Sequence, residues 1–160
     1  MNSKLLGIYL NDHWAASVGG VELAKRLRAS NRRSALGEYL AKFLRELAEE
    51  QQTVTGVLRR IGIPRSRLKQ GAVWLAEKAG RAKLNGQLTG YSPLSRVIEL
   101  EGLVAGINAK LCLWHALRIL DNETLVPKAD VDRLIQQAED QVTQIERFRR
   151  EAARTAFKQT

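Results

Sequence analysis

The sequence contains one cysteine, three prolines and two histidines among its 160 residues, and only 6% of the residues are aromatic. A single cysteine cannot form a disulfide within the chain, so a disulfide framework is excluded. Because proline is scarce, long stretches contain no residue that would break a helix. Two histidines also supply few nitrogen ligands for a transition metal. The absences therefore favour long helices and argue against a metal-dependent fold.

The stretches between the prolines are rich in Leu, Ala, Glu, Arg and Lys, which are strong helix formers. Apolar residues recur at helical spacing in four long segments, at about 3–29, 35–61, 91–120 and 128–155. A shorter helix is expected at 66–84, within the connection between the second and third segments. With 44% hydrophobic residues, the chain is large enough to bury one core. We predict an all-α fold with a single domain at 1–160.

The segment 91–120 is the most apolar part of the chain and carries apolar residues on more than one side. Polar residues, among them Asn108, Lys110 and Arg118, interrupt the apolar run, so a buried bundle helix fits better than a membrane span. We expect this helix to be central. The predicted common core consists of Tyr9, Leu10, Phe43, Leu47, Val54, Leu100, Val104, Leu111, Ile135 and Val142.

The predicted helices form two hairpins joined by a long connection that contains its own helix. A connection of this length can carry the chain back to the other end, so that 35–61 and 91–120 run parallel. This helix order resembles that of the ferritin-like four-helix bundles over nearly the whole chain. The resemblance implies two antiparallel hairpins with an additional short crossover helix. Di-iron members of that group carry a Glu on each of two helices and a Glu-x-x-His on each of the other two.

This chain contains no Glu-x-x-His, and its two histidines cannot complete two such motifs. We therefore expect no metal and no cofactor. The alternative is a divergent ferritin-like protein with a metal-binding or oxidative-stress role, whose ligands would be His13, Glu46, Glu50 and Glu101, with Glu49 in place of Glu50 as a variant. The competing interpretation is a buried polar network that fixes helix register, with Glu101 enclosed between Val97 and Val104.

No catalytic arrangement is evident elsewhere. There is no Gly-rich phosphate loop, and the glycines inside helices lie where two helices can approach closely; they are Gly19, Gly20, Gly102 and Gly106. Cys112 and His115 are three positions apart, as in a thiol–imidazole pair, but their Leu and Trp neighbours favour packing. We expect Cys112 to be a small buried hydrophobe.

The chain has 26 Lys and Arg against 17 Asp and Glu, which gives a net charge of +9. The predicted topology brings the ends of the first, crossover and last helices to one end of the bundle. The anion-binding candidates there are Arg28, Arg32, Arg33, Arg81, Lys83, Arg150 and Arg154. One explanation is that helix dipoles favour cations at helix C-termini. The other is an anionic partner, which would be nucleic acid, a phospholipid surface or an acidic protein.

The N-terminal apolar run meets Asn11, Asp12 and His13 too soon for a signal peptide, so we expect a cytoplasmic protein. Aromatic residues near the basic clusters are few, which does not favour stacking on single-stranded bases. The hypothesis from the sequence is a non-catalytic helical-bundle protein that binds or interacts, engaging an anionic partner through a basic end. Assembly into a homo-oligomer is left open.

Overall fold

The computed structural model describes residues 1–65, 91–120 and 122–158. These residues form four α-helices and no strand: α1 Ser3–Ser30, α2 Ala35–Arg60, α4 Pro93–Leu120 and α5 Lys128–Phe157. The helix bounds agree with the four predicted segments to within two residues, so the all-α prediction is confirmed. The helix predicted at 66–84 lies outside the described residues.

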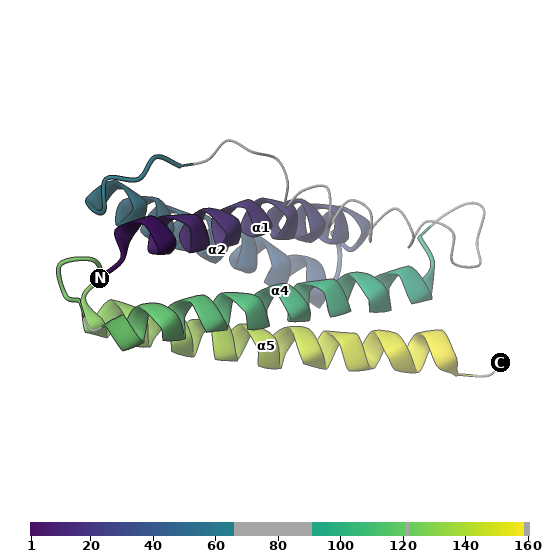
Figure 1. The fold of residues 1–160 in the computed structure, drawn as a ribbon. Coiled ribbons are helices and arrows are strands. Elements are labelled where there is room, and N and C mark those ends of the chain that lie inside the picture. The colour runs from purple at the N-terminus through teal and green to yellow at the C-terminus, as the bar shows by residue number, and fades with distance from the viewer. Residues whose placement is uncertain (66–90, 121, 159–160) are drawn as a thin grey trace.

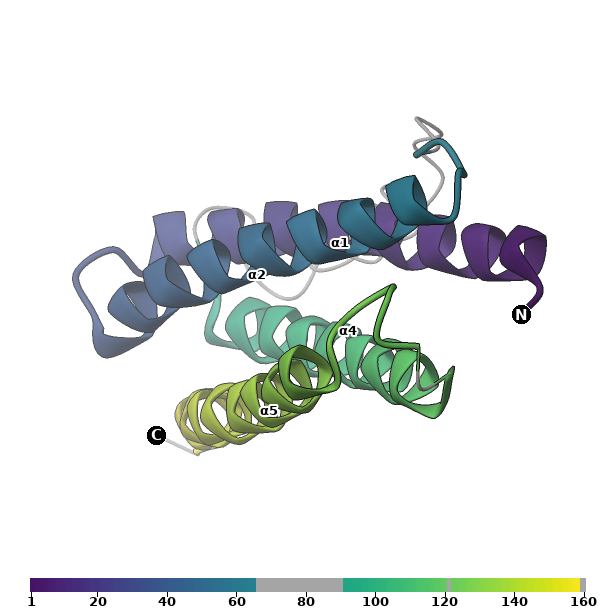
Figure 2. The ribbon, with the colours of Figure 1, turned by 90° about the vertical axis from the view of Figure 1, so that its left-hand side faces the viewer.

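The helices form two antiparallel hairpins, α1 with α2 and α4 with α5, which lie one above the other as two layers (Figures 1 and 2). As predicted, α2 and α4 run in the same direction (Figure 1). The two hairpins cross at an angle (Figure 2). The layers meet mainly where α1 packs on α4, whereas α2 and α5 approach each other over only a short stretch.

Local signals in the sequence account for the helix ends. The Asn2 side chain accepts a hydrogen bond from the Leu5 amide at the start of α1, and Ser92 does the same for the Ser95 amide at the start of α4. Gly62 follows α2 with a φ of 73°, a left-handed conformation that favours glycine. The chain therefore leaves α2 at the position where the sequence predicts the helix to end.

One core is shared by all four helices. Half of the predicted core is buried, namely Leu10, Phe43, Leu47, Val54 and Leu100. The other half is partly buried and packs against it, namely Tyr9, Val104, Leu111, Ile135 and Val142. The largest fully buried side chain is Trp114, which the prediction did not include. The indole of Trp114 and the ring of Phe43 supply much of the bulk of the core.

Part of the α4 surface is left uncovered. In the most apolar 18-residue stretch of α4, only 28% is buried. Ala105, Gly106, Ala109 and Cys112 are exposed. The prediction that Cys112 is buried is therefore wrong, because α1 and α5 cover other sides of the helix. Within the described ranges, α4 is the one helix long and apolar enough to cross a membrane, a test that core helices of soluble proteins also pass.

Candidate anion-binding site and a buried polar network

The turn between α1 and α2 is held in one conformation by its own side chains. Asn31 is buried, and its carbonyl oxygen accepts a hydrogen bond of 2.8 Å from the Ser34 hydroxyl. The same hydroxyl accepts a hydrogen bond from the Gly37 amide, which caps α2. A Cβ atom at Gly37 would lie 2.1 Å from the Asn31 carbonyl oxygen, so only glycine fits there. This fixed turn carries Arg32 and Arg33, both exposed.

A groove of about 570 Å³ lies beside this turn. Its charged lining consists of Lys25, Arg28, Arg32 and Glu38. Lys25 is bound to Glu22 at 2.8 Å, whereas Arg28 and Arg32 have no carboxylate partner in the part of the chain that the structure describes. Three cations against one carboxylate give the groove a positive potential that attracts anions.

The helix dipole explains only part of this cluster. Arg28 lies in the last turn of α1, where the negative end of the helix dipole favours a cation. Arg32 and Arg33 lie in the turn between the C-terminus of α1, where the dipole favours cations, and the N-terminus of α2, where the dipole disfavours them. The two helix ends act on these arginines in opposite directions, so the dipoles give no net reason for two cations in this turn.

The C-terminal end of α5 lies at the same end of the bundle as the α1–α2 turn (Figure 1). It contributes Arg150 and Arg154. Arg150 is bound to Glu146 at 2.9 Å, and Arg149 binds the same carboxylate at 2.6 Å. These hydrogen bonds lower the pKa of Glu146 to about 2. Arg154 has no carboxylate partner among the described residues, so of the two arginines it is the one whose guanidinium is available to an anion.

The structure thus gathers Arg28, Arg32 and Arg33 at one turn and places the end of α5 at the same end of the molecule. Arg81 and Lys83 lie outside the described residues. Whether these cations form one contiguous surface stays a prediction from the topology.

Another cation at this end has an internal role. Arg26 binds the buried carboxylate of Glu99 at 2.8 Å, and the Tyr91 hydroxyl donates to the same carboxylate at 2.9 Å. Burial and the neighbouring charge of Glu99 raise the pKa of Tyr91. These contacts join the last turns of α1 to the beginning of α4. Arg26 is therefore used within the fold and is not an anion-binding candidate.

The sequence prediction chose the wrong carboxylate of α4. Glu101, expected to be enclosed, is 54% exposed at its side chain and lies 3.4 Å from Arg149. Glu99 is the buried one, at 6% exposure. Glu99 and Glu101 are two positions apart, and side chains at that spacing on a helix point about 200° apart. Only one of the two can therefore face α1.

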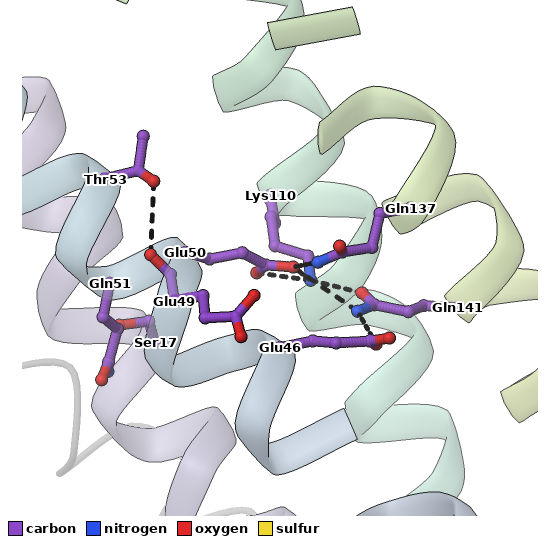
Figure 3. Close-up of polar contacts among 9 residues, drawn as sticks. All are labelled: Ser17, Glu46, Glu49, Glu50, Gln51, Thr53, Lys110, Gln137 and Gln141. Carbon is purple, nitrogen blue, oxygen red and sulfur yellow. Dashed lines mark hydrogen bonds and ion pairs between the residues drawn. The ribbon is translucent and has the colours of Figure 1, made fainter. Parts of the chain in front are cut away.

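A second polar cluster lies inside the bundle, where side chains of α2, α4 and α5 converge (Figure 3). The Glu50 carboxylate is buried and lies 2.7 Å from Nζ of Lys110. Gln137 donates to Glu50 at 2.8 Å, and Gln141 donates to Glu46 at 2.7 Å. Burial lowers the pKa of Lys110, while the charge of Glu50 acts in the opposite direction. Long polar side chains thus span the gap between α2 and α5.

The alternative metal ligands come together only in part. Glu46 and Glu50 converge on Gln141, and His13 lines the same cavity as Glu50. Glu101 lies apart, on the exposed side of α4. In the described ranges no group of three or more His, Cys, Asp or Glu side chains has a metal-binding arrangement. The Lys110 ammonium already supplies the positive charge beside Glu50, so this cluster fits a structural network.

Sequence reasoning found Glu46 and Glu50 but missed Gln137 and Gln141. The available signal was the position of Gln141, which interrupts an apolar stripe on α5 between Ala138 and Ile145. Comparison of the chain with protein-family models, curated proteins and solved structures gave no match.

Proposed function

We propose that this protein is a non-catalytic helical bundle that binds the phosphate backbone of nucleic acid through a basic pole. The basic pole is defined by the described residues Arg28, Arg32, Arg33, Arg150 and Arg154, to which the sequence prediction adds Arg81 and Lys83. One observation carries the proposal: a turn held by its own hydrogen bonds keeps Arg32 and Arg33 exposed and without carboxylate partners among the described residues, between two helix ends whose dipoles act in opposite directions.

The chemistry of these side chains suits phosphate. Each guanidinium presents several N–H donors in a planar fork that matches two phosphate oxygens. The turn is held by Asn31, Ser34 and Gly37, so little backbone freedom is lost on binding. The groove charges come from Lys25, Arg28 and Arg32 and no aromatic ring lines the groove, which favours contact with the backbone over base stacking.

The experiment is a binding titration with labelled duplex DNA and RNA at several salt concentrations, read by fluorescence anisotropy. If about four phosphates are neutralised, affinity should fall roughly 10²-fold between 50 and 200 mM salt. The test variant is Arg32→Glu with Arg33→Glu. The control is Arg59→Glu with Arg133→Glu, two exposed arginines from the opposite end of the bundle. Both variants change the net charge equally.

We expect the Arg32 and Arg33 reversal to weaken binding at least tenfold and the control to change it much less. Equal losses of affinity in the two variants would show that only the net charge matters. If the protein bound no nucleic acid at low salt, helix dipoles and solubility would suffice to explain the positive charge of the basic pole. Anionic vesicles and an acidic polypeptide serve as comparison ligands. If the vesicles or the polypeptide bound more tightly than nucleic acid, with the same dependence on Arg32 and Arg33, that ligand would replace nucleic acid as the proposed partner.

Three further proposals concern the fold family, the location and the assembly of the chain. The resemblance to ferritin-like bundles, with a crossover helix at 66–84, is supported by the two hairpins and the parallel course of α2 and α4. A cytoplasmic location is supported by the single, exposed cysteine. Assembly into a homo-oligomer stays a prediction, and no contact among the described residues assigns it to one surface.

A further inference from the structure

A cavity of about 180 Å³ lies between α1, α2 and α4, away from the basic pole. Its inner wall includes the apolar side chains of Phe43, Leu47, Leu113 and Trp114. Small residues of α1 and α4 line its outer part, among them Gly20 and Gly106. The cavity is accessible from outside because Gly106 and its neighbour Ala105 are exposed.

The cavity arises where α1 and α4 separate. A Cβ atom at Gly102 would lie 3.0 Å from the Leu23 side chain, so the two helices touch there. Gly20 precedes Leu23 in α1 and Gly106 follows Gly102 in α4, each by about one turn. A Cβ atom at either glycine would meet nothing within 4 Å. The glycines were predicted to let the helices approach closely. This is correct at Gly102, but at Gly20 and Gly106 the space is left unfilled.

The polar groups around the cavity are mostly bonded to one another. Lys110 is bound to Glu50 and Gln141, which neutralises the charges at the cavity floor. The Ser17 hydroxyl donates to the Trp14 carbonyl and accepts from Gln51. A charged ligand would lose its hydration here and find no free counter-charge. The walls therefore favour an uncharged, largely apolar molecule.

Three polar groups at the cavity keep hydrogen-bonding capacity: the indole N–H groups of Trp14 and Trp114, which have no hydrogen-bond partner among the described residues, and the ring of His13. An indole N–H can only donate, so His13 is the one of these three that can also accept a hydrogen bond. Its ring is half-buried and meets the edge of Tyr9, with 4.5 Å between the ring centroids. The ring nitrogens form no hydrogen bond within the described part of the chain. Burial lowers the pKa of His13 below 6.5, despite the opposing charge of Asp12, so the ring is neutral at pH 7. A neutral imidazole can exchange one hydrogen bond with a hydroxyl group.

We propose that this cavity binds an uncharged single-ring aromatic alcohol of the phenol class, with its ring among the apolar side chains and its hydroxyl at His13. The volume suits this size, because a cavity of about 150 Å³ with an apolar lining accommodates benzene. The inference does not depend on nucleic-acid binding, since the residues concerned belong to a different part of the bundle.

The test uses the whole protein and four probes of equal ring size: phenol, benzene, benzoate and benzylamine. Binding is measured by isothermal titration calorimetry and by saturation-transfer NMR of the probe. The blocking variant is Gly20→Leu, which places an isobutyl group in the open space. Its matched control is Gly56→Leu, another half-buried glycine within a helix that is not among the lining residues. Gly106→Leu is a second blocking variant, should Gly20→Leu lose its cooperative unfolding.

We expect phenol to bind with a millimolar or lower dissociation constant, and benzoate and benzylamine to bind at least tenfold more weakly. The blocking variants should weaken phenol binding at least tenfold, and Gly56→Leu by less than twofold. His13→Phe should weaken phenol binding but leave benzene binding within twofold. The proposal is overturned by the absence of phenol binding, by equal losses in the blocking and control variants, or by binding of benzoate equal to that of phenol. A change in sedimentation mass with Gly20→Leu, without loss of phenol binding, would instead assign the open space to a second copy of the chain.

Discussion

Nζ of Lys110 on α4 lies 2.7 Å from a carboxylate oxygen of Glu50 on α2; the Glu50 side chain is buried, and that of Lys110 is 12% exposed. The two helices belong to different hairpins, so this ion pair links the two layers of the bundle. Gln137 and Gln141 extend the link from α2 to α5 (Figure 3). A network of this kind fixes the register of the hairpins because a shift would leave buried charges without partners.

Removal of one member of the pair should be costly. Lys110→Met leaves the Glu50 carboxylate buried and uncompensated, which should lower the free energy of unfolding by about 3–5 kcal/mol. The double variant Lys110→Met with Glu50→Leu should recover most of this loss, because no charge is then buried. The exposed pair of Lys25 and Glu22 is the control, and Lys25→Met should cost about 0–1 kcal/mol. Urea denaturation measures all three, and a double variant as unstable as the single one would contradict the argument.

The conformation of the α1–α2 turn should depend on Gly37. Gly37→Ala places a methyl group against the Asn31 carbonyl oxygen, which is backbone and cannot move aside cheaply. We expect a loss of about 1–3 kcal/mol in unfolding free energy, the range for overpacking. Gly56→Ala, where a Cβ atom would meet only the end of the Arg60 side chain at 3.9 Å, should instead gain roughly 0.5–1 kcal/mol from reduced backbone entropy. If Gly37→Ala were as stable as Gly56→Ala, the turn would not be held as described.

The core position of α4 can be tested by truncation. Leu100 is completely buried, so Leu100→Ala should cost about 2–5 kcal/mol. Leu111 is only partly buried, so its truncation should cost less, roughly 1–2 kcal/mol. Losses below about 1 kcal/mol at both positions, measured by urea denaturation, would show that α4 is not central.

The acid titration of Glu146 follows from its two arginine partners. Its pKa is about 2 in the folded protein, below the ordinary value of 4.5, because Arg149 and Arg150 bind the charged form. The resulting stabilisation is fully present above pH 4.5 and is lost as the pH falls from 4.5 towards 2. Carboxyl-detected NMR should place the midpoint near 2 in the wild type and higher in Arg149→Ala. Glu146→Gln should reduce the pH dependence of stability in this window. An unchanged midpoint in Arg149→Ala would refute the assigned cause.

The sequence by itself determined the four long helices and their ends. Apolar periodicity, Ser34 before α2, Gly62 after it and Ser92 before α4 are local signals, and local hydrogen bonding and backbone freedom decide helix ends. The two-hairpin order followed from the lengths of the connections. The placement of Arg32 and Arg33 in a tight turn also depends on local sequence, and it was predicted correctly.

Only the tertiary structure decided which polar residues are inside. Glu99 and Glu101 have similar neighbours in sequence, yet Glu99 is buried beside Arg26 and Glu101 faces outward. Cys112 is exposed although its helix is apolar on several sides. The physical reason is that periodicity gives the direction of a side chain relative to its own helix, whereas burial depends on where the other hairpin crosses it. That crossing is set by contacts between residues far apart in the chain, and it also determines that α1 and α4 touch at Gly102 but leave open space at Gly20 and Gly106.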